Sequence, residues 1–247
     1  MTDSIMCKKH NFERKYLKSM YSMSREIKYY APCPYCAKER QEEEEKEELK
    51  KLYDNLNLSN IGRKYYPLTF SNLKKISPSF EDAKKRAIKY CEVAQVCKEK
   101  GLGIYFFGDN GRGKTTLMAC MIKELIKKGY KPYFTTLIEL QENIFNKLIT
   151  IEEVKNKDFL FIDDIGTEST TKNNDVSWIG EKLFEIVSHR DKELLPTIFS
   201  SNFKISELID KGVMKKTAER ISTLGTVKLE IVSEESFRNN KEIDIPF

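Results

Sequence analysis

Long hydrophobic runs are absent from this chain of 247 residues, and no segment approaches the stretch of about 20 apolar residues that a membrane helix needs. Residues 1–15 are charged and contain no apolar stretch of the signal-peptide type. Cysteine is scarce as well, and six cysteines in a chain without an export signal do not indicate a disulfide framework. These absences exclude a membrane-spanning or disulfide-rich secreted protein, and we expect a cytoplasmic one with no membrane partner.

The composition that remains is that of a globular, charged protein. Hydrophobic residues make up 40% of the chain, enough for a packed core, and charged residues make up 33%. The net charge of +5 is uneven, because residues 37–54 hold eight acidic and five basic residues, a net −3, which leaves +8 elsewhere. A basic surface permits contact with nucleic acid, although solubility alone also explains such a balance.

The chain divides into three predicted regions. Residues 1–36 form a short module with paired metal-ligand spacings, and residues 37–79 join a charged helix at 37–56 to an irregular linker. Residues 80–247 alternate strand and helix. Strands are predicted at 104–108, 133–136, 159–163, 197–200 and 227–232, and helices at 80–100, 114–128, 137–149 and 176–189. The fold class is therefore α/β, with a parallel sheet covered by helices on both faces.

The strongest motif is GDNGRGKT at residues 108–115, which matches G-x-x-x-x-G-K-[ST] and lies between a predicted strand and a predicted helix. Its glycines let backbone N–H groups turn toward phosphate oxygens, and the helix adds the positive end of its dipole. Lys114 would reach the β- and γ-phosphates of ATP, and Thr115 would bind Mg²⁺. We expect Lys114 to be exposed until phosphate binds. The predicted nucleotide contacts are Gly108, Asp109, Asn110, Gly111, Arg112, Gly113, Lys114, Thr115, Thr116 and Asp163.

Polar side chains follow two other predicted strands. In FLFIDDIG, residues 159–166, two carboxylates end a buried strand, where the ligand crevice of an open α/β sheet lies. Asp163 would hold Mg²⁺, and Asp164 would orient or deprotonate the water that attacks the γ-phosphate. Alternatively, Asp164 simply begins a turn. Asn202 ends the strand PTIFSSN and could hold the attacking water, or it could be the side chain of an Asx-turn.

These motifs, with their flanks, resemble the DnaC/DnaI-type helicase loaders of the AAA+ superfamily, and the related IstB-like transposition ATPases share much of the pattern. The resemblance rests on the P-loop, the acidic pair and three further blocks: HRDKELLPTIFSSN at 189–202, AERI at 218–221 and ESFR at 235–238. It implies that Arg220 is an arginine finger reaching the γ-phosphate of a neighbouring subunit, so the working form would be a homo-oligomer. It also implies that Arg238 contacts the nucleotide in its own subunit. By spacing alone, both arginines could be ordinary surface charges.

One residue departs from the pattern of many AAA+ ATPases, which carry Glu where this chain has Asp164. Because aspartate is shorter by one methylene, the attacking water would be less well placed and hydrolysis would be slow. The resemblance to helicase loaders tolerates this aspartate, and a slow switch suits a protein that acts once per loading event.

Two close pairs of ligands lie near the amino terminus, Cys7-x-x-His10 and Cys33-x-x-Cys36. Three sulfurs and one imidazole suit a tetrahedral, structural Zn²⁺ site, although the four side chains could also be unrelated. Phage-type members of the helicase-loader family that the chain resembles often begin with a similar C-x-x-H…C-P-x-C module. Basic residues interleaved with aromatic ones surround these ligands, and they could bind single-stranded DNA or dock onto the helicase.

Three functions compete at this point. The resemblance favours a loader whose partners are a replicative hexameric helicase and single-stranded DNA. An IstB-like transposition helper would use the same core to bind DNA beside a transposase. A small-molecule kinase with a P-loop would not explain Asn202, Arg220 and Arg238 as a set.

Overall fold

The computed structural model describes residues 4–22, 25–167 and 175–232, and the chain divides into two compact units, Met1–Leu52 and Tyr53–Phe247. The boundary lies inside the charged helix rather than at either end of the predicted region 37–79. Each unit contains its own sheet.

The first unit holds a three-stranded antiparallel sheet that the sequence patterns did not predict. Its strands are β1 (Ser4–Met6), β2 (Glu13–Ser22) and β3 (Arg25–Tyr30), in the order β1-β2-β3. The pairing of β2 with β3 shifts register between Tyr16 and Lys18. An irregularity of this kind interrupts the alternation of side chains along a strand, so a period of two is hard to recognise in the sequence.

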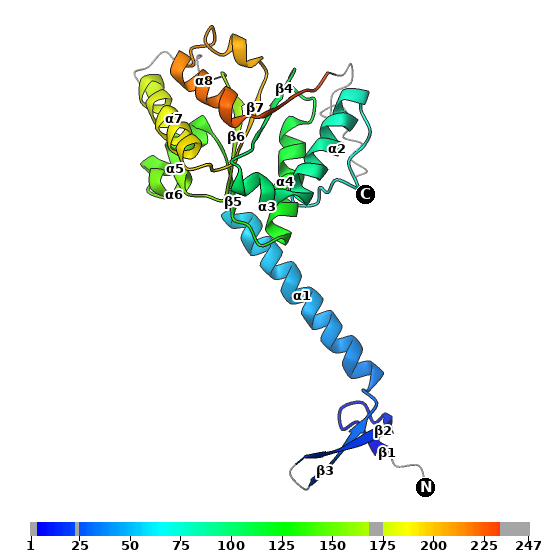
Figure 1. Ribbon diagram of the computed structural model, residues 1–247. Helices are drawn as coiled ribbons and strands as arrows, with labels where there is room; N and C mark the ends of the chain where they lie inside the picture. The colour runs from blue at the N-terminus through cyan, green and yellow to red at the C-terminus, as the bar shows by residue number, and fades with distance from the viewer. Residues whose placement is uncertain (1–3, 23–24, 168–174, 233–247) are drawn as a thin grey trace, which may run out of the picture. The chain divides into compact units, whose positions relative to one another are not determined.

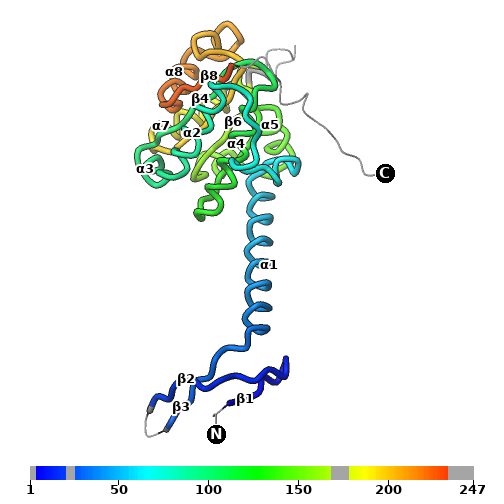
Figure 2. Tube along the Cα trace, turned by 90° about the vertical axis from the view of Figure 1, so that its right-hand side faces the viewer, coloured from blue at the N-terminus to red at the C-terminus, as the bar shows by residue number. Residues whose placement is uncertain are grey.

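Helix α1 (Pro34–Leu58) extends slightly beyond both predicted limits, 37 and 56. Proline suits the first turn, because it has no N–H to leave unpaired there. Only Leu56 of this helix is buried. Most of the helix is therefore stabilised by strong helix formers and by surface pairs such as Lys38–Glu42, at 3.9 Å, rather than by packing. Figure 2 shows α1 as one unbroken helix.

The second unit is built on a five-stranded parallel sheet in the order β5-β6-β7-β4-β8. Its strands are β4 (Ile104–Phe107), β5 (Pro132–Thr136), β6 (Phe159–Ile165), β7 (Thr197–Ser201) and β8 (Val227–Glu230). The predicted parallel sheet is therefore confirmed. The first four residues of β6 are fully buried, as expected of a strand covered on both faces.

Helices cover both faces of this sheet (Figure 1). One face carries α2 (Pro78–Glu92), α3 (Ala94–Glu99) and α4 (Lys114–Lys127); the other carries α5 (Leu137–Phe145), α6 (Ile151–Lys155), α7 (Asp175–Lys192) and α8 (Lys215–Leu224). The single helix predicted at 80–100 is two helices, because the backbone of Val93 leaves the helical region (φ −99°, ψ 26°). No helix in the described part of the chain is both long and apolar enough to cross a membrane.

The segment predicted as an irregular linker, residues 57–79, is part of the second unit and packs against its helix α4. It includes a short 3₁₀ helix, η1 (Arg63–Tyr65), and it buries Ile61, Phe70 and Leu73. Lys123 of α4 donates a hydrogen bond to the Leu68 carbonyl at 2.8 Å and another to the Tyr66 carbonyl. The segment is thus irregular in backbone but fixed by burial and hydrogen bonds, which composition alone does not reveal.

Candidate nucleotide-binding and metal-binding sites

The P-loop connects β4 to the first turn of α4, as its motif predicts. Three of its glycines have left-handed backbones: φ is +133° at Gly108, +76° at Gly111 and +88° at Gly113. Gly108 has a second reason to lack a side chain, since a Cβ there would lie 2.2 Å from the carbonyl oxygen of Ile231. These positions let the loop curl in a way that L-residues with a Cβ rarely adopt.

Lys114 is not exposed, contrary to the expectation above. Only 5% of its surface is accessible, and its ammonium donates to the carbonyl oxygens of Gly108 (2.6 Å) and Asp109 (3.0 Å). A third hydrogen bond joins it to Asn202 Oδ1 at 2.9 Å. Because the Lys114 ammonium already donates hydrogen bonds to these three oxygens, a bound phosphate would compete with them for Lys114.

The oxygen ligands expected for Mg²⁺ come together at the ends of β6 and α4. Thr115 Oγ1 donates to Asp163 Oδ2 at 2.7 Å, and Asp163 is 4% exposed. Ser200 of β7, which the motifs did not single out, donates to the other oxygen of Asp163 and accepts from the Asp164 N–H at 3.1 Å. A carboxylate and a hydroxyl are the hard oxygen ligands that Mg²⁺ prefers, so these residues fit the ion.

Asp164 and Asn202 lie beside this pair, Asp164 in β6 and Asn202 directly after the neighbouring strand β7. Asp164 has a left-handed backbone (φ +56°) at the place where the β6–β7 register shifts, so the chain bulges at this residue. Asn202 points to Lys114, and the local turn is made by Ser201, whose Oγ accepts from the Phe203 N–H at 3.1 Å. The Asx-turn interpretation of Asn202 is therefore not what the structure shows.

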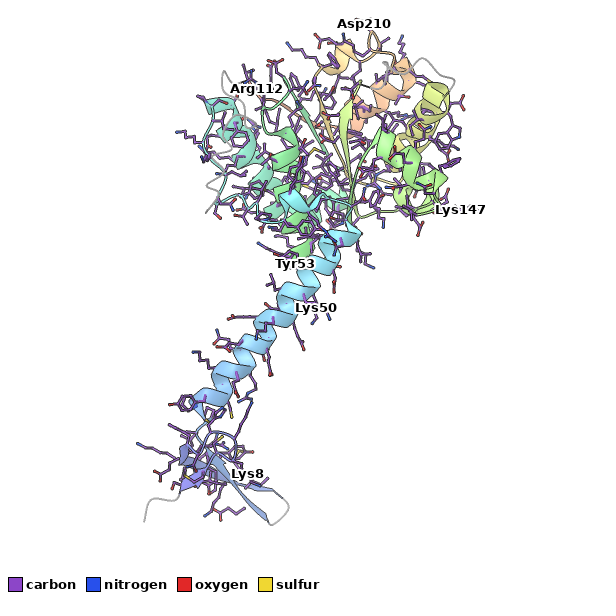
Figure 3. All side chains as sticks on the ribbon, turned by 180° about the vertical axis from the view of Figure 1, so that it is seen from behind. Lys8, Lys50, Tyr53, Arg112, Lys147 and Asp210 are labelled. Carbon is purple, nitrogen blue, oxygen red and sulfur yellow. The ribbon has the colours of Figure 1, made fainter. Side chains whose placement is uncertain are left out.

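The remaining P-loop side chains lie at the rim of the site. Asp109 and Asn110 are exposed, and Arg112 lies 3.9 Å from the Asp109 carboxylate. Thr116 is partly buried in the first turn of α4. In Figure 3, Arg112 and Asp210, from the segment after β7, lie at the same end of this unit. That end is the carboxyl edge of the sheet, where a parallel α/β fold places its ligand.

The arginines differ in what they can reach. Arg220, on α8, is 49% exposed and forms an ion pair with Asp191 near the end of α7. Arg190 is fully buried and donates to backbone carbonyls at the end of α6 and on the loops before β6 and β7, so it cannot reach a neighbouring molecule. Arg238 lies outside the described residues.

The four predicted zinc ligands converge in the first unit. Cys36 Sγ, Cys33 Sγ and Cys7 Sγ lie 3.3, 3.7 and 3.9 Å from His10 Nδ1, and the Cys7 and Cys36 sulfurs are 3.5 Å apart. Ligands of a tetrahedral zinc ion, at 2.0–2.3 Å from the metal, are about 3.5–3.8 Å from one another. The chemistry and the spacing of this donor set therefore fit Zn²⁺.

Glu39 supports the cluster from outside, and sequence analysis did not find it. Its Oε1 lies 3.2 Å from His10 Nε2, and its Oε2 accepts from Lys9 at 2.7 Å. A hydrogen bond from Nε2–H to a carboxylate leaves Nδ1 unprotonated and facing the sulfurs, which is how metal-bound histidines are oriented. The sequence feature that could have identified Glu39 is its position three residues after Cys36, which places both residues on the same face of α1.

The cysteines of this cluster have opposed pKa shifts. The backbone N–H of His10 stabilises the Cys7 thiolate and lowers the pKa of Cys7 to about 6. Sharing a hydrogen bond with Cys7 raises the pKa of Cys36 to about 11. Neighbouring sulfurs resist carrying several negative charges together, and a divalent cation would stabilise all of them as thiolates.

The fold and the P-loop constellation define an AAA+-type P-loop protein. No protein-family model matches the chain. Among characterised proteins, the replicative helicase loader DnaI of Bacillus subtilis (strain 168) is 31% identical over 190 residues, an alignment that covers 74% of this chain and 57% of DnaI. The chain thus spans little more than half the length of that relative.

Solved structures show the same fold. A protein of Streptococcus pyogenes serotype M3, described as a candidate primosome component, is 25% identical with a TM-score of 0.61, over 74% of this chain and 96% of that one. The crystal structure of DnaI is 24% identical with a TM-score of 0.58, over 70% of this chain and 95% of that one. The resemblance to the DnaC/DnaI-type helicase loaders is therefore confirmed in sequence and in fold.

Proposed function

We propose that this protein binds ATP and loads a replicative hexameric helicase onto DNA at the start of replication. The observation that carries the proposal is the meeting of Lys114, Thr115, Asp163 and Asn202 at the carboxyl edge of an AAA+ sheet whose sequence is similar to DnaI. An IstB-like transposition helper is the alternative within the same superfamily, and the similarity to a named helicase loader favours the first function.

Each residue of the site has a role in this proposal. The P-loop amides and Lys114 bind the phosphates, and Thr115 and Asp163 hold Mg²⁺, which neutralises charge on the β- and γ-phosphates when bound. Asp164 takes a proton from the attacking water, which Asn202 orients. Arg220 of one subunit and Arg238 of another complete a site between subunits of a homo-oligomer. Hydrolysis is slow, because the short Asp164 places the water less well than glutamate would.

The first unit carries Zn²⁺ on Cys7, His10, Cys33 and Cys36 and contacts the helicase or single-stranded DNA. The ion is structural, since four protein ligands complete a tetrahedron. A cytoplasmic location, where such a helicase acts, belongs to the same proposal.

The test of the loader function is reconstitution. The protein, mixed with a purified replicative hexameric helicase and ATP, should form a complex in size-exclusion chromatography. It should also transfer the helicase to circular single-stranded DNA, scored by unwinding of an annealed oligonucleotide. Unwinding that is the same with and without the protein, together with the absence of a complex, would refute the loader function.

Removing one zinc ligand should unfold the first unit alone. We expect Cys33→Ser to lower the zinc content from one ion per chain to nearly none, because a structural ion contributes folding free energy to its own small module. Mass spectrometry of the native protein measures the metal, and limited proteolysis locates the unfolded part. Cys97→Ser, a buried cysteine outside the cluster, is the matched control and should keep the ion. A parent protein purified without zinc would contradict this assignment.

A further inference from the structure

A pocket of about 440 Å³ opens beside the residues proposed to hold Mg²⁺. Thr115 and Asp163 form part of its lining, together with Thr136 at the end of β5. Another part comes from residues 57–66, which comprise the last two residues of α1 and the chain directly after it. The proposed catalytic cycle gives these residues no role.

The segment 57–66 is fixed against the edge of the sheet. The Phe134 N–H of strand β5 donates to the Ser59 carbonyl at 2.8 Å, and the Asn60 side chain donates to the Phe134 carbonyl at 3.0 Å. Within the segment, the Tyr66 hydroxyl donates to Asn57 Oδ1 at 2.7 Å. The segment is therefore attached to the edge strand β5 by one backbone hydrogen bond and one from the Asn60 side chain, and it lines the pocket from that side.

The pocket carries two cations from this segment. Arg63 and Lys64 are exposed to solvent and line the pocket, and the Lys64 ammonium lies 4.8 Å from the centre of the Tyr65 ring. The carboxylates in the lining are Asp163 and Glu139. Bound Mg²⁺ would more than offset the charge of Asp163, and the two cations Arg63 and Lys64 outnumber the remaining carboxylate, Glu139. With the ion in place, the pocket favours an anion.

We propose that this pocket receives the γ-phosphate end of Mg²⁺-bound ATP, and that Arg63 and Lys64 of the same subunit bind it. The inference rests on the proposed nucleotide site. Thr115 and Asp163 mark where the β- and γ-phosphate oxygens meet the ion, and the pocket begins at these two side chains. The additional negative charge of a triphosphate lies on this side, and the guanidinium of Arg63 has the fork of donors that suits phosphate. Recognition of ATP over ADP therefore depends on the segment that continues α1.

Nucleotide discrimination tests this proposal in the full-length protein. Arg63→Met should weaken binding of Mg²⁺–ATPγS about tenfold or more, the usual value of a charged hydrogen bond, and change Mg²⁺–ADP binding less than about twofold. Lys64→Met should act in the same direction. Lys75→Met removes an exposed lysine that does not line the pocket, and it should change neither affinity. Isothermal titration calorimetry measures all of these affinities.

The outcomes separate this inference from the proposed function. A parent protein that binds neither nucleotide would refute the nucleotide site itself. A parent that binds both, with Arg63→Met weakening ATPγS and ADP equally or not at all, would overturn only the role of Arg63. Weaker binding of single-stranded DNA by Arg63→Met, with both nucleotides unchanged, would also overturn it, since the cations would then serve nucleic acid.

Discussion

Replacing Arg190 with methionine should lower the free energy of unfolding of the second unit by about 3 kcal/mol or more. Arg190 is 0% exposed, and its Nη1 and Nη2 donate to the carbonyls of Lys155 (2.7 Å), Lys157 (2.9 Å) and Pro196 (2.6 Å). Its Nε donates to Thr197 Oγ1 at 2.8 Å. Methionine preserves much of the side-chain volume but leaves these buried acceptors without their hydrogen-bond donor. Buried polar groups that lose their partner destabilise the folded state.

Unfolding in urea measures this effect, because the single tryptophan, Trp178, lies on α7 and reports on this unit by fluorescence. The matched control is Arg86→Met on α2, which removes an exposed arginine paired with Asp82 at 2.8 Å. Surface pairs contribute about 0–1 kcal/mol, so the control should change little. If both variants lost the same free energy of unfolding, Arg190 would not be the residue that holds the two loops together.

The structural role of Arg190 could not be inferred from the sequence. From the sequence alone, Arg190 in the block at 189–202 could serve as an alternative inter-subunit arginine, because a sequence gives the order of residues and not their depth in the fold. Burial lowers the pKa of Arg190, since leaving water disfavours the charged form, yet neutral carbonyls on the loops before β6 and β7 accept its hydrogen bonds. Those loops approach each other only when β6 pairs with β7.

Features that arise from local chemistry were predictable. The strands of the parallel sheet follow from apolar runs bounded by helical patterns, and the P-loop follows from glycine spacing. Contacts that depend on strand pairing could not be predicted. Ser200, for example, reaches Asp163 only because β6 pairs with β7, and these strands are far apart in sequence. The burial of Lys114 was missed for a related reason, because its acceptor Asn202 is the residue directly after β7.

The structure of the first unit was also predicted only in part. The ligand spacings predicted its metal cluster, since close Cys and His pairs have few other uses, whereas its strands escaped notice. A sheet with little buried surface has weak alternation, and Leu17, Met20 and Ile27 are all exposed apolar residues. A metal ion on the Cys/His cluster, as proposed, would therefore contribute much of what holds this unit together in place of a hydrophobic core.

Arg220→Ala should bind ATP nearly as well as the parent but lose much of its hydrolysis. The P-loop, Lys114 and Thr115 belong to the nucleotide's own subunit, whereas a finger arginine acts from the neighbouring one. Such fingers contribute about 10³-fold or more to the rate, and the slow site of Asp164 would show a smaller factor. The fold should persist, because Arg220 is half-exposed and its pair with Asp191 is a surface one. Calorimetry measures binding, and phosphate release measures hydrolysis.

Mixing variants then decides whether Arg220 acts between subunits. Lys114→Ala should not bind ATP but should still present an intact Arg220, so we expect a mixture of the two variants to recover part of the activity. Lys114 is buried against Gly108, Asp109 and Asn202, so the melting temperature and assembly of its variant are measured first. Arg238→Ala should not be rescued by this mixing, because its defect and that of Lys114→Ala belong to the same half-site. If both variants assemble and the Arg220→Ala mixture stays inactive, Arg220 is a helix-surface residue, and buried Arg190 cannot replace it.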